Sequence, residues 1–157
     1  MLRRILPVCA LLTVACGRTI ATSAKTESKL APPDAYKCVT KQLDTLGFER
    51  TSHDDKEFRL TARKENPKIT FSSPTFQKTW DRIEAQAVAG PTGTELQVKA
   101  STAAQYFVQT GIVLNELSPS DDVKRAAQEL MRRCSEPAPP APATPAPAPA
   151  PAPPGAQ

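Results

Sequence analysis

The sequence predicts a two-layer α+β sandwich, in which two helices cover one face of a sheet of four antiparallel strands. Three observations lead to this fold class. Apolar residues recur at helical spacing at both ends of the segment 34–135, and they alternate with polar residues between those ends. In addition, each of the two helical stretches carries one cysteine. The expected order is therefore helix, four strands, helix.

The first helix is expected to begin behind Asp34, which can act as its N-cap, and to end at Gly47, a natural C-cap. Cys38 lies near the edge of the apolar face of this helix. That face consists of Tyr36, Val39, Leu43 and Leu46. The helix can therefore bury one side on a sheet and hold a thiol beside the core.

Period-two alternation marks the strands that follow. Its clearest runs have their apolar positions at Phe58, Leu60 and Ala62, at Ile83, Ala85 and Ala87, and at Leu96, Val98 and Ala100. A shorter strand is expected to begin at Phe48 and to turn at His53-Asp54-Asp55-Lys56, and Gly90-Pro91-Thr92-Gly93 is the expected turn between the last two strands. Such alternation is typical of antiparallel strands with one buried and one solvated face.

The start of the second helix is signalled by Ser118-Pro119-Ser120-Asp121, with Ser118 as cap and Pro119 at the first position. Arg132 and Arg133 fall in its last turn, where the helix dipole favours cations. One face carries Val123, Ala126, Ala127, Leu130 and Cys134. Cys134 is therefore expected to point toward the core.

Two stretches do not fit four strands. Residues 64–78, with Pro67 and Pro74, are expected to form a long loop. Residues 100–115 carry no charge, so they either extend the fourth strand into the core or form an exposed apolar surface for a protein partner or a membrane. Under the second interpretation the candidate partner-binding residues are Tyr106, Phe107 and Ile112.

The first fifteen residues have the pattern of an export signal, because Arg3 and Arg4 precede an apolar run that is too short to span a bilayer. The end of the run, Leu12-Thr13-Val14-Ala15-Cys16-Gly17, resembles the lipobox of bacterial lipoproteins, with Thr13 where such motifs usually carry Leu. The resemblance implies that Cys16 is the lipidated first residue of the mature chain. Since Gly17 is not Asp, it also implies the periplasmic face of the outer membrane. Ordinary cleavage, after Ala24, is the alternative.

Cysteine usage then predicts one disulfide. Exported chains enter an oxidising compartment, where thiols tend to pair. Cys9 leaves with the signal and Cys16 carries lipid, so Cys38 and Cys134 remain to pair with each other. A redox-active pair or a pair of metal ligands would be the alternatives, but Cys-x-x-Cys spacing is absent. A structural disulfide is expected, with no cofactor.

The remaining segments are short of apolar residues. Residues 16–33 are expected to be a flexible tether between the lipid and the domain at 34–135. Residues 136–157 are rich in Pro and Ala and are expected to be a disordered tail that acts as a polyproline II spacer. A ligand for a proline-binding domain is the alternative interpretation of the tail.

Residue types that carry catalysis are scarce. His53 is the only histidine and lies in an expected turn, and the chain has no Gly-x-Ser-x-Gly motif. The Gly90-Pro91-Thr92-Gly93 turn lacks the Lys-Ser/Thr of a phosphate loop. The sequence therefore predicts no catalytic residue, no metal site and no enzyme.

Charge adds one exclusion. Lys and Arg number 20 against 16 Asp and Glu, and two of the arginines lie in the signal, which excludes the strong field of a nucleic-acid binder. Arg59, Arg63, Lys64 and Lys68 are interleaved with acids that are expected on the surface, namely Glu57, Glu65, Asp81, Glu84 and Glu95. A patch for anionic lipid or glycan is the alternative.

These observations predict a lipid-anchored bacterial envelope protein with a binding or scaffolding role. Its expected partners are the membrane, through the acyl chains, and an envelope protein. The alternative is a periplasmic or secreted module that binds a small hydrophobic ligand between helices and sheet, where Ala62, Ala85, Ala87 and Ala100 leave room.

Overall fold

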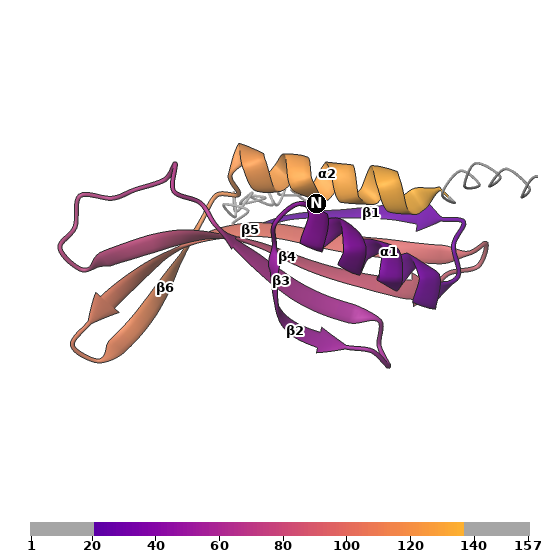
Figure 1. Ribbon diagram of the computed structural model, residues 1–157, viewed down its shortest axis with the longest axis horizontal. Coiled ribbons are helices and arrows are strands. Elements are labelled where there is room, and N and C mark those ends of the chain that lie inside the picture. The colour runs from indigo at the N-terminus through magenta and orange to yellow at the C-terminus, as the bar shows by residue number, and fades with distance from the viewer. Residues whose placement is uncertain (1–20, 137–157) are drawn as a thin grey trace, which may run out of the picture.

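Residues 21–136 are described by the computed structural model, and they form one antiparallel sheet with two helices on one of its faces (Figure 1). In chain order the elements are β1 (Ala21–Ser28), α1 (Pro32–Thr45), β2 (Glu49–Asp54), β3 (Arg59–Glu65), β4 (Phe76–Ala89), β5 (Thr94–Val108), β6 (Gly111–Leu117) and α2 (Asp121–Ser135). The predicted α+β class is confirmed. The sheet has six strands in this part of the chain rather than the predicted four.

The long strand β5 organises the sheet. The strand order is β1-β5-β4-β3-β2, and β6 pairs with β5 beside that path. β4 runs along nearly the whole of one edge of β5. The other edge is shared, because residues 94–101 pair with β1 and residues 102–108 pair with β6. The β5–β6 hairpin therefore extends beyond the part of the sheet that the helices cover (Figure 1).

The prediction of a flexible tether over residues 16–33 is wrong for residues 21–28, which form β1. β1 lacks an apolar alternation, so its place in the sheet depends on its backbone ladder with β5 and on polar contacts. The Ser28 hydroxyl donates to the Cys134 carbonyl oxygen at 2.6 Å, and the Lys29 amide donates to the Ser135 carbonyl oxygen at 3.1 Å. The end of β1 is thereby held against the end of α2.

Both helices begin at other residues than predicted. α1 starts at Pro32, with Ala31 as its N-cap and prolines in the first turn, where a missing N–H costs little. α2 starts at Asp121, and its N-cap is Ser120 rather than Ser118, because the Ser120 hydroxyl accepts a hydrogen bond from the Val123 amide.

Two loop predictions also change. The connection between β3 and β4 is residues 66–75, shorter at both ends than the predicted 64–78. His53 belongs to β2, and the turn follows it, where the Asp54 carboxylate accepts from the amides of Lys56 and Glu57. The predicted signal (1–15), the lipidation site Cys16 and the tail from residue 137 onward lie outside the described residues.

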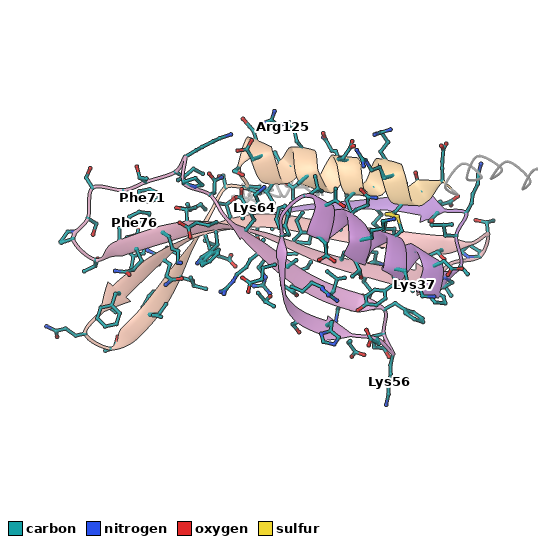
Figure 2. All side chains as sticks on the ribbon, in the orientation of Figure 1. Lys37, Lys56, Lys64, Phe71, Phe76 and Arg125 are labelled. Carbon is teal, nitrogen blue, oxygen red and sulfur yellow. A yellow bond between two sulfur atoms is a disulfide. The ribbon has the colours of Figure 1, made fainter. Side chains whose placement is uncertain are left out.

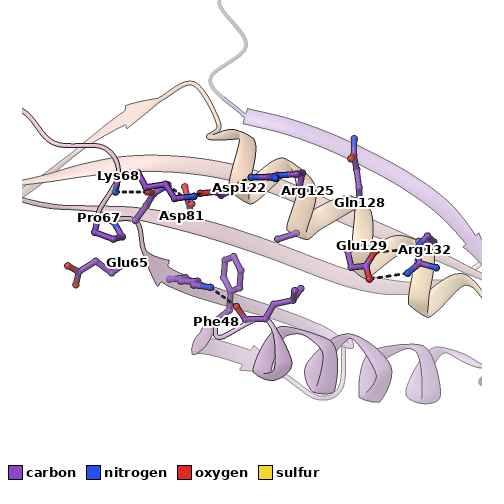
Figure 3. A pocket seen from close by; sticks show the side chains of 14 residues that line it. Phe48, Glu65, Pro67, Lys68, Asp81, Asp122, Arg125, Gln128, Glu129 and Arg132 are labelled. Carbon is purple, nitrogen blue, oxygen red and sulfur yellow. Dashed lines mark hydrogen bonds and ion pairs between the residues drawn. The ribbon is translucent and has the colours of Figure 1, made fainter.

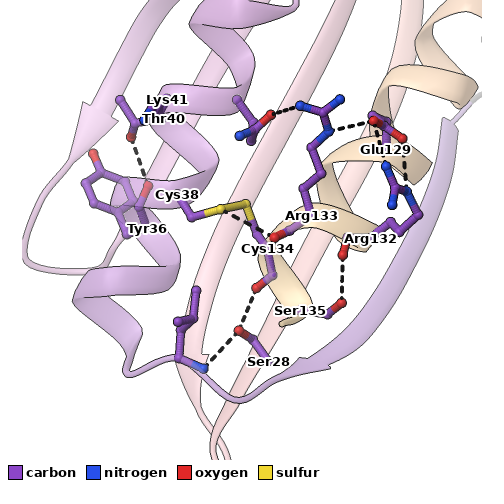
Figure 4. The surroundings of a disulfide bond; sticks show 12 residues. Ser28, Tyr36, Cys38, Thr40, Lys41, Glu129, Arg132, Arg133, Cys134 and Ser135 are labelled. Atoms are coloured by element: carbon purple, nitrogen blue, oxygen red, sulfur yellow. Dashed lines mark hydrogen bonds and ion pairs between the residues drawn. A yellow bond between two sulfur atoms is a disulfide. The ribbon is translucent and has the colours of Figure 1, made fainter. Parts of the chain in front are cut away.

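The core lies between the helices and the inner face of the sheet. It contains Val39 and Leu43 from α1, Val123 and Leu130 from α2, and the alternating strand residues that were predicted to be buried. Ala62, Ala85, Ala87 and Ala100 are buried in it, so helix side chains fill the room that these small residues leave. The predicted disulfide between Cys38 and Cys134 is present, with 5.8 Å between the two Cα atoms, and it joins α1 to α2 (Figure 4).

Candidate functional site

The β5–β6 hairpin carries the most exposed of the large apolar side chains in the described part of the chain. Phe107 is 60% exposed, Ile112 is 65% exposed and Leu114 is 56% exposed. Phe107 and Ile112 face each other across the ladder, and Leu114 faces Gln105 on the same side. The three residues are called the hairpin face below.

The hairpin face points away from the helices. Thr102 and Ala104 are buried on the helix side of β5, and strand alternation places Gln105 and Phe107 on the opposite side. Two of the three predicted partner-binding residues, Phe107 and Ile112, are therefore brought together. Leu114 lies beside them on the same side. This placement follows from the pairing register of β6 with β5, and the sequence alone did not indicate it.

Tyr106, the third predicted residue, lies on the other side of the hairpin. Its ring packs against Phe76 at 5.8 Å and against Phe71 at 6.3 Å between centroids, and Phe71 and Phe76 are 5.5 Å apart. Phe71 comes from the loop 66–75, which lies beside the start of β4 (Figure 2). Tyr106 therefore supports the hairpin from the side opposite to Phe107 and Ile112.

The outer edge of β6 has no strand beside it among residues 21–136. The Phe107 amide donates to the Thr75 carbonyl oxygen, so the backbone groups of Phe107 point away from β6. In an antiparallel ladder this direction alternates, so Tyr106 and Val113 bond to each other. The N–H and C=O groups of Ile112 and Leu114 therefore point to the open edge.

The opposite edge of the sheet, formed by β2, has features that protect it from pairing with a strand of another chain. β2 carries Glu49, Arg50 and Asp54, and its pairing with β3 is irregular between Arg50 and Ser52. Charges and bulges of this kind oppose pairing with another chain. β6 has Glu116 as its one charged residue and pairs without irregularity.

The sheet face beside the hairpin is charged instead. The Trp80 ring lies between the Arg63 guanidinium, 4.3 Å from its centroid, and the Lys78 ammonium, at 4.6 Å. The Trp80 indole N–H donates to the Gln105 side chain at 2.7 Å. This neighbouring face therefore presents cationic groups around Trp80 rather than a continuation of the apolar hairpin surface.

A groove of about 810 Å³ lies between α2 and the end of β3 (Figure 3). Leu46 and Phe48 give it apolar walls. Its charges pair with one another: Asp122 bonds to Lys68 at 2.7 Å and also to Arg125, which lowers the pKa of Asp122. Bonds from Arg132 and Arg133 likewise lower the pKa of Glu129. These paired charges leave the groove without a strong preference for a charged ligand.

Asp81 is a buried carboxylate that the sequence reasoning placed on the surface. It is 4% exposed and accepts hydrogen bonds from Asn66 at 2.8 Å, from Thr102 at 2.7 Å and from Ser120 at 2.8 Å. Asp81 has the same parity as Ile83 and Ala85, so alternation could have identified it as an inward residue. The Ser120 hydroxyl also caps α2, so this cluster ties the sheet to the helix.

A metal-binding cluster and a membrane-spanning helix are both absent from residues 21–136. No three His, Cys, Asp or Glu side chains in that range lie close enough together to hold a metal ion. No helix there is both long and apolar enough to cross a membrane. His53 is exposed on β2, at the charged edge of the sheet.

Comparison with known proteins assigns no family to this chain. No protein-family model matches the chain, and no curated protein matches it. Among solved structures, one similar chain is a DUF4468 family protein from Bacteroides ovatus ATCC 8483, with 12% identity, 72% of this chain and 75% of that chain covered, and a TM-score of 0.38. A likeness of this size assigns neither a fold family nor an activity to the chain.

Proposed function

We propose that this chain is a lipid-anchored bacterial envelope protein that binds a protein partner through the hairpin face. The observation that carries the binding role is the exposure of Phe107, Ile112 and Leu114 side by side on a hairpin whose residues 100–115 carry no charge. Contiguous apolar surface of this kind is characteristic of interaction sites on soluble domains. The role is binding or scaffolding rather than catalysis.

The anchor rests on the motif that ends at Cys16. Cleavage before Cys16 leaves β1 whole, whereas ordinary cleavage after Ala24 would cut β1 in half and remove part of its ladder with β5. This difference supports Cys16 as the first mature residue. The periplasmic face of the outer membrane is proposed from Gly17, the residue after Cys16. Four residues lie between Cys16 and Ala21, so the backbone of Cys16 lies at most about 18 Å from the start of β1.

Backbone polarity favours a protein over lipid as the occupant of the hairpin. The N–H and C=O groups of Ile112 and Leu114 point to an open edge, and hydrocarbon offers them no hydrogen-bond partner. The hairpin also lacks the lysines and arginines that attract anionic headgroups. An extended strand of another protein satisfies both the apolar side chains and the backbone groups.

The anchor is tested by intact mass of the full chain expressed in a Gram-negative host, measured without reductant on the membrane and periplasmic fractions. We expect a membrane-bound species that begins at Cys16 with added acyl mass. A soluble species cut near Ala24 would overturn the lipoprotein assignment.

The binding role is tested by crosslinking and co-purification from the same membranes. Phe107→Asp and Ile112→Asp should each reduce the recovery of the specific crosslinked partner by at least about tenfold, because they place a charge in the contact. Thr51→Asp, an exposed change on the charged edge strand β2, is the matched control and should retain the partner. Equal recovery from all three variants would refute the hairpin face as the binding site.

A second candidate function is the binding of a small hydrophobic ligand. The groove of about 810 Å³ with apolar walls at Leu46 and Phe48 favours it. Native mass spectrometry of the purified protein would show a retained molecule, and Phe48→Ala should release it. Protein that is free of any ligand in that experiment would remove this candidate.

A further inference from the structure

We infer that the occupant of the open edge is β6 of a second copy, paired antiparallel about a twofold axis at Val113. The inference rests on the proposed function, since it names the partner of the hairpin face. It commits to one register, which follows from the backbone directions, side chains and charges of β6.

The direction of the backbone groups of β6 limits which residues can form hydrogen bonds with a second copy. Ile112 and Leu114 both direct their N–H and C=O groups to the open edge. About an axis at Val113, Ile112 of one copy faces Leu114 of the other, so each pair exchanges two hydrogen bonds. Val113 then faces its own equivalent as a pair that is not hydrogen-bonded, in which side chains approach closely.

Side chains match in the same register. On one side of the joined sheet the hairpin faces of the two copies become one continuous apolar strip. On the other side the two Val113 side chains meet beside Tyr106, which is the ladder partner of Val113. Apolar cross-strand pairs of this kind stabilise antiparallel pairing.

Neighbouring registers match less well. An axis at Ile112 places Leu114 opposite Thr110, and an axis at Leu114 places Ile112 opposite Glu116. The axis at Val113 instead places Glu116 opposite Thr110, so that the carboxylate faces neither an apolar residue nor the other Glu116. A twofold interface needs such a self-complementary pattern, because one surface must fit itself.

The test is disulfide crosslinking in membranes of full-chain variants that each carry one added cysteine besides the native ones, read on non-reducing gels. Val113→Cys should form at least about tenfold more homodimer than Thr51→Cys on β2, because the two Cα atoms of a close antiparallel pair lie within disulfide range. Ile112→Cys and Leu114→Cys should each crosslink weakly alone. When the two are co-expressed they should give the mixed dimer.

The outcomes separate the two proposals. Strong homodimer from Ile112→Cys or Leu114→Cys alone, with none from Val113→Cys, would overturn the register. Crosslinking of Val113→Cys only to another protein would overturn the second copy as the partner and leave the binding role intact. Absence of any crosslink, together with unchanged co-purification for Phe107→Asp and Ile112→Asp, would overturn both. All three cysteine sites are exposed, and circular dichroism of each variant checks that it is folded.

Discussion

Asp81 shows how one residue can couple several segments. Its carboxylate receives hydrogen bonds from the loop after β3, from β5 and from the cap of α2, through Asn66, Thr102 and Ser120. Thr102 in turn accepts a hydrogen bond from the Ser120 amide at 2.9 Å. The carboxyl group is buried among neutral donors, and removing it would leave those donors without an acceptor.

Asp81→Ala should therefore lower the free energy of unfolding by about 3 kcal/mol, since buried donors left unpaired each carry a desolvation cost. Glu84→Ala is the matched control on the same strand. Glu84 is on the outer face and pairs with Arg82 at 3.0 Å in a partly exposed ion pair, so its removal should cost less than about 1 kcal/mol. Urea denaturation of both variants makes the comparison, and equal losses would contradict the role given to Asp81.

Tyr36 gives a prediction about pH. Burial, and then the hydrogen bond that its hydroxyl donates to Asp55 at 2.8 Å, raise its pKa from 10.0 to about 12. Because the folded pKa lies above the unfolded one, the contribution of Tyr36 to stability is complete below pH 10 and is lost as the pH rises to about 12.

The titration is measured by tyrosinate absorbance. The chain has two tyrosines, so Tyr106→Phe leaves Tyr36 alone. Its ionisation should be centred near pH 12, and adding Asp55→Asn should lower that midpoint only in part, because burial is the larger cause. A midpoint near 10 in the first variant would show that the phenol is solvated.

At the scale of elements, the sequence was sufficient to predict those strands and helices whose apolar side chains recur periodically and face the core. The central parts of β3, β4 and β5 were predicted from alternating residues such as Leu60, Ile83 and Val98. Both helices were predicted from apolar residues at helical spacing, such as Val39 and Leu130. β1 was not predicted, because a polar strand held by its backbone carries no periodic signal.

β6 was not predicted for a different reason. Its side chains are apolar on both faces, so Ile112 and Val113 give a continuous run that resembles a buried segment as much as an exposed one. Which residues shared a face depended on the register with β5. The candidate site could therefore be located from the sequence to within a segment, but Tyr106 and Leu114 could not be assigned to their faces.

Gly93 offers a test of β1 as a strand. A Cβ added at Gly93 would lie 2.7 Å from the Ser28 carbonyl oxygen at the end of β1, so Gly93→Ala should push that end away and cost about 1–3 kcal/mol of unfolding free energy. Gly90→Ala, in the same turn, meets its nearest atom at 3.5 Å and is the control. Amide hydrogen exchange should show lost protection in β1 for the first variant only, and equal protection in both would argue against the close approach.

At the scale of the whole molecule, β5 joins two regions that differ in what covers them. Residues 94–101 lie beside β1 in the region covered by the helices, whereas residues 102–108 lead into the hairpin. The disulfide between Cys38 and Cys134 and the hydrogen bond from Ser28 to the Cys134 carbonyl join α1 and the end of β1 to the C-terminal end of α2 (Figure 4). Stability is therefore concentrated at one end and the proposed binding surface at the other.

The disulfide should account for a large part of that stability. Cys38 and Cys134 are separated by 96 residues, and for a loop of that length the chain-entropy model gives on the order of 4–5 kcal/mol. The variant with both Cys38→Ala and Cys134→Ala should therefore unfold at a markedly lower urea concentration, and the reduced parent chain, which keeps both sulfurs in the core, should show most of the same shift. If reduction alone left the midpoint unchanged, the loss in the double variant would come from the emptied core positions, and the stabilising role of the covalent bond would be refuted.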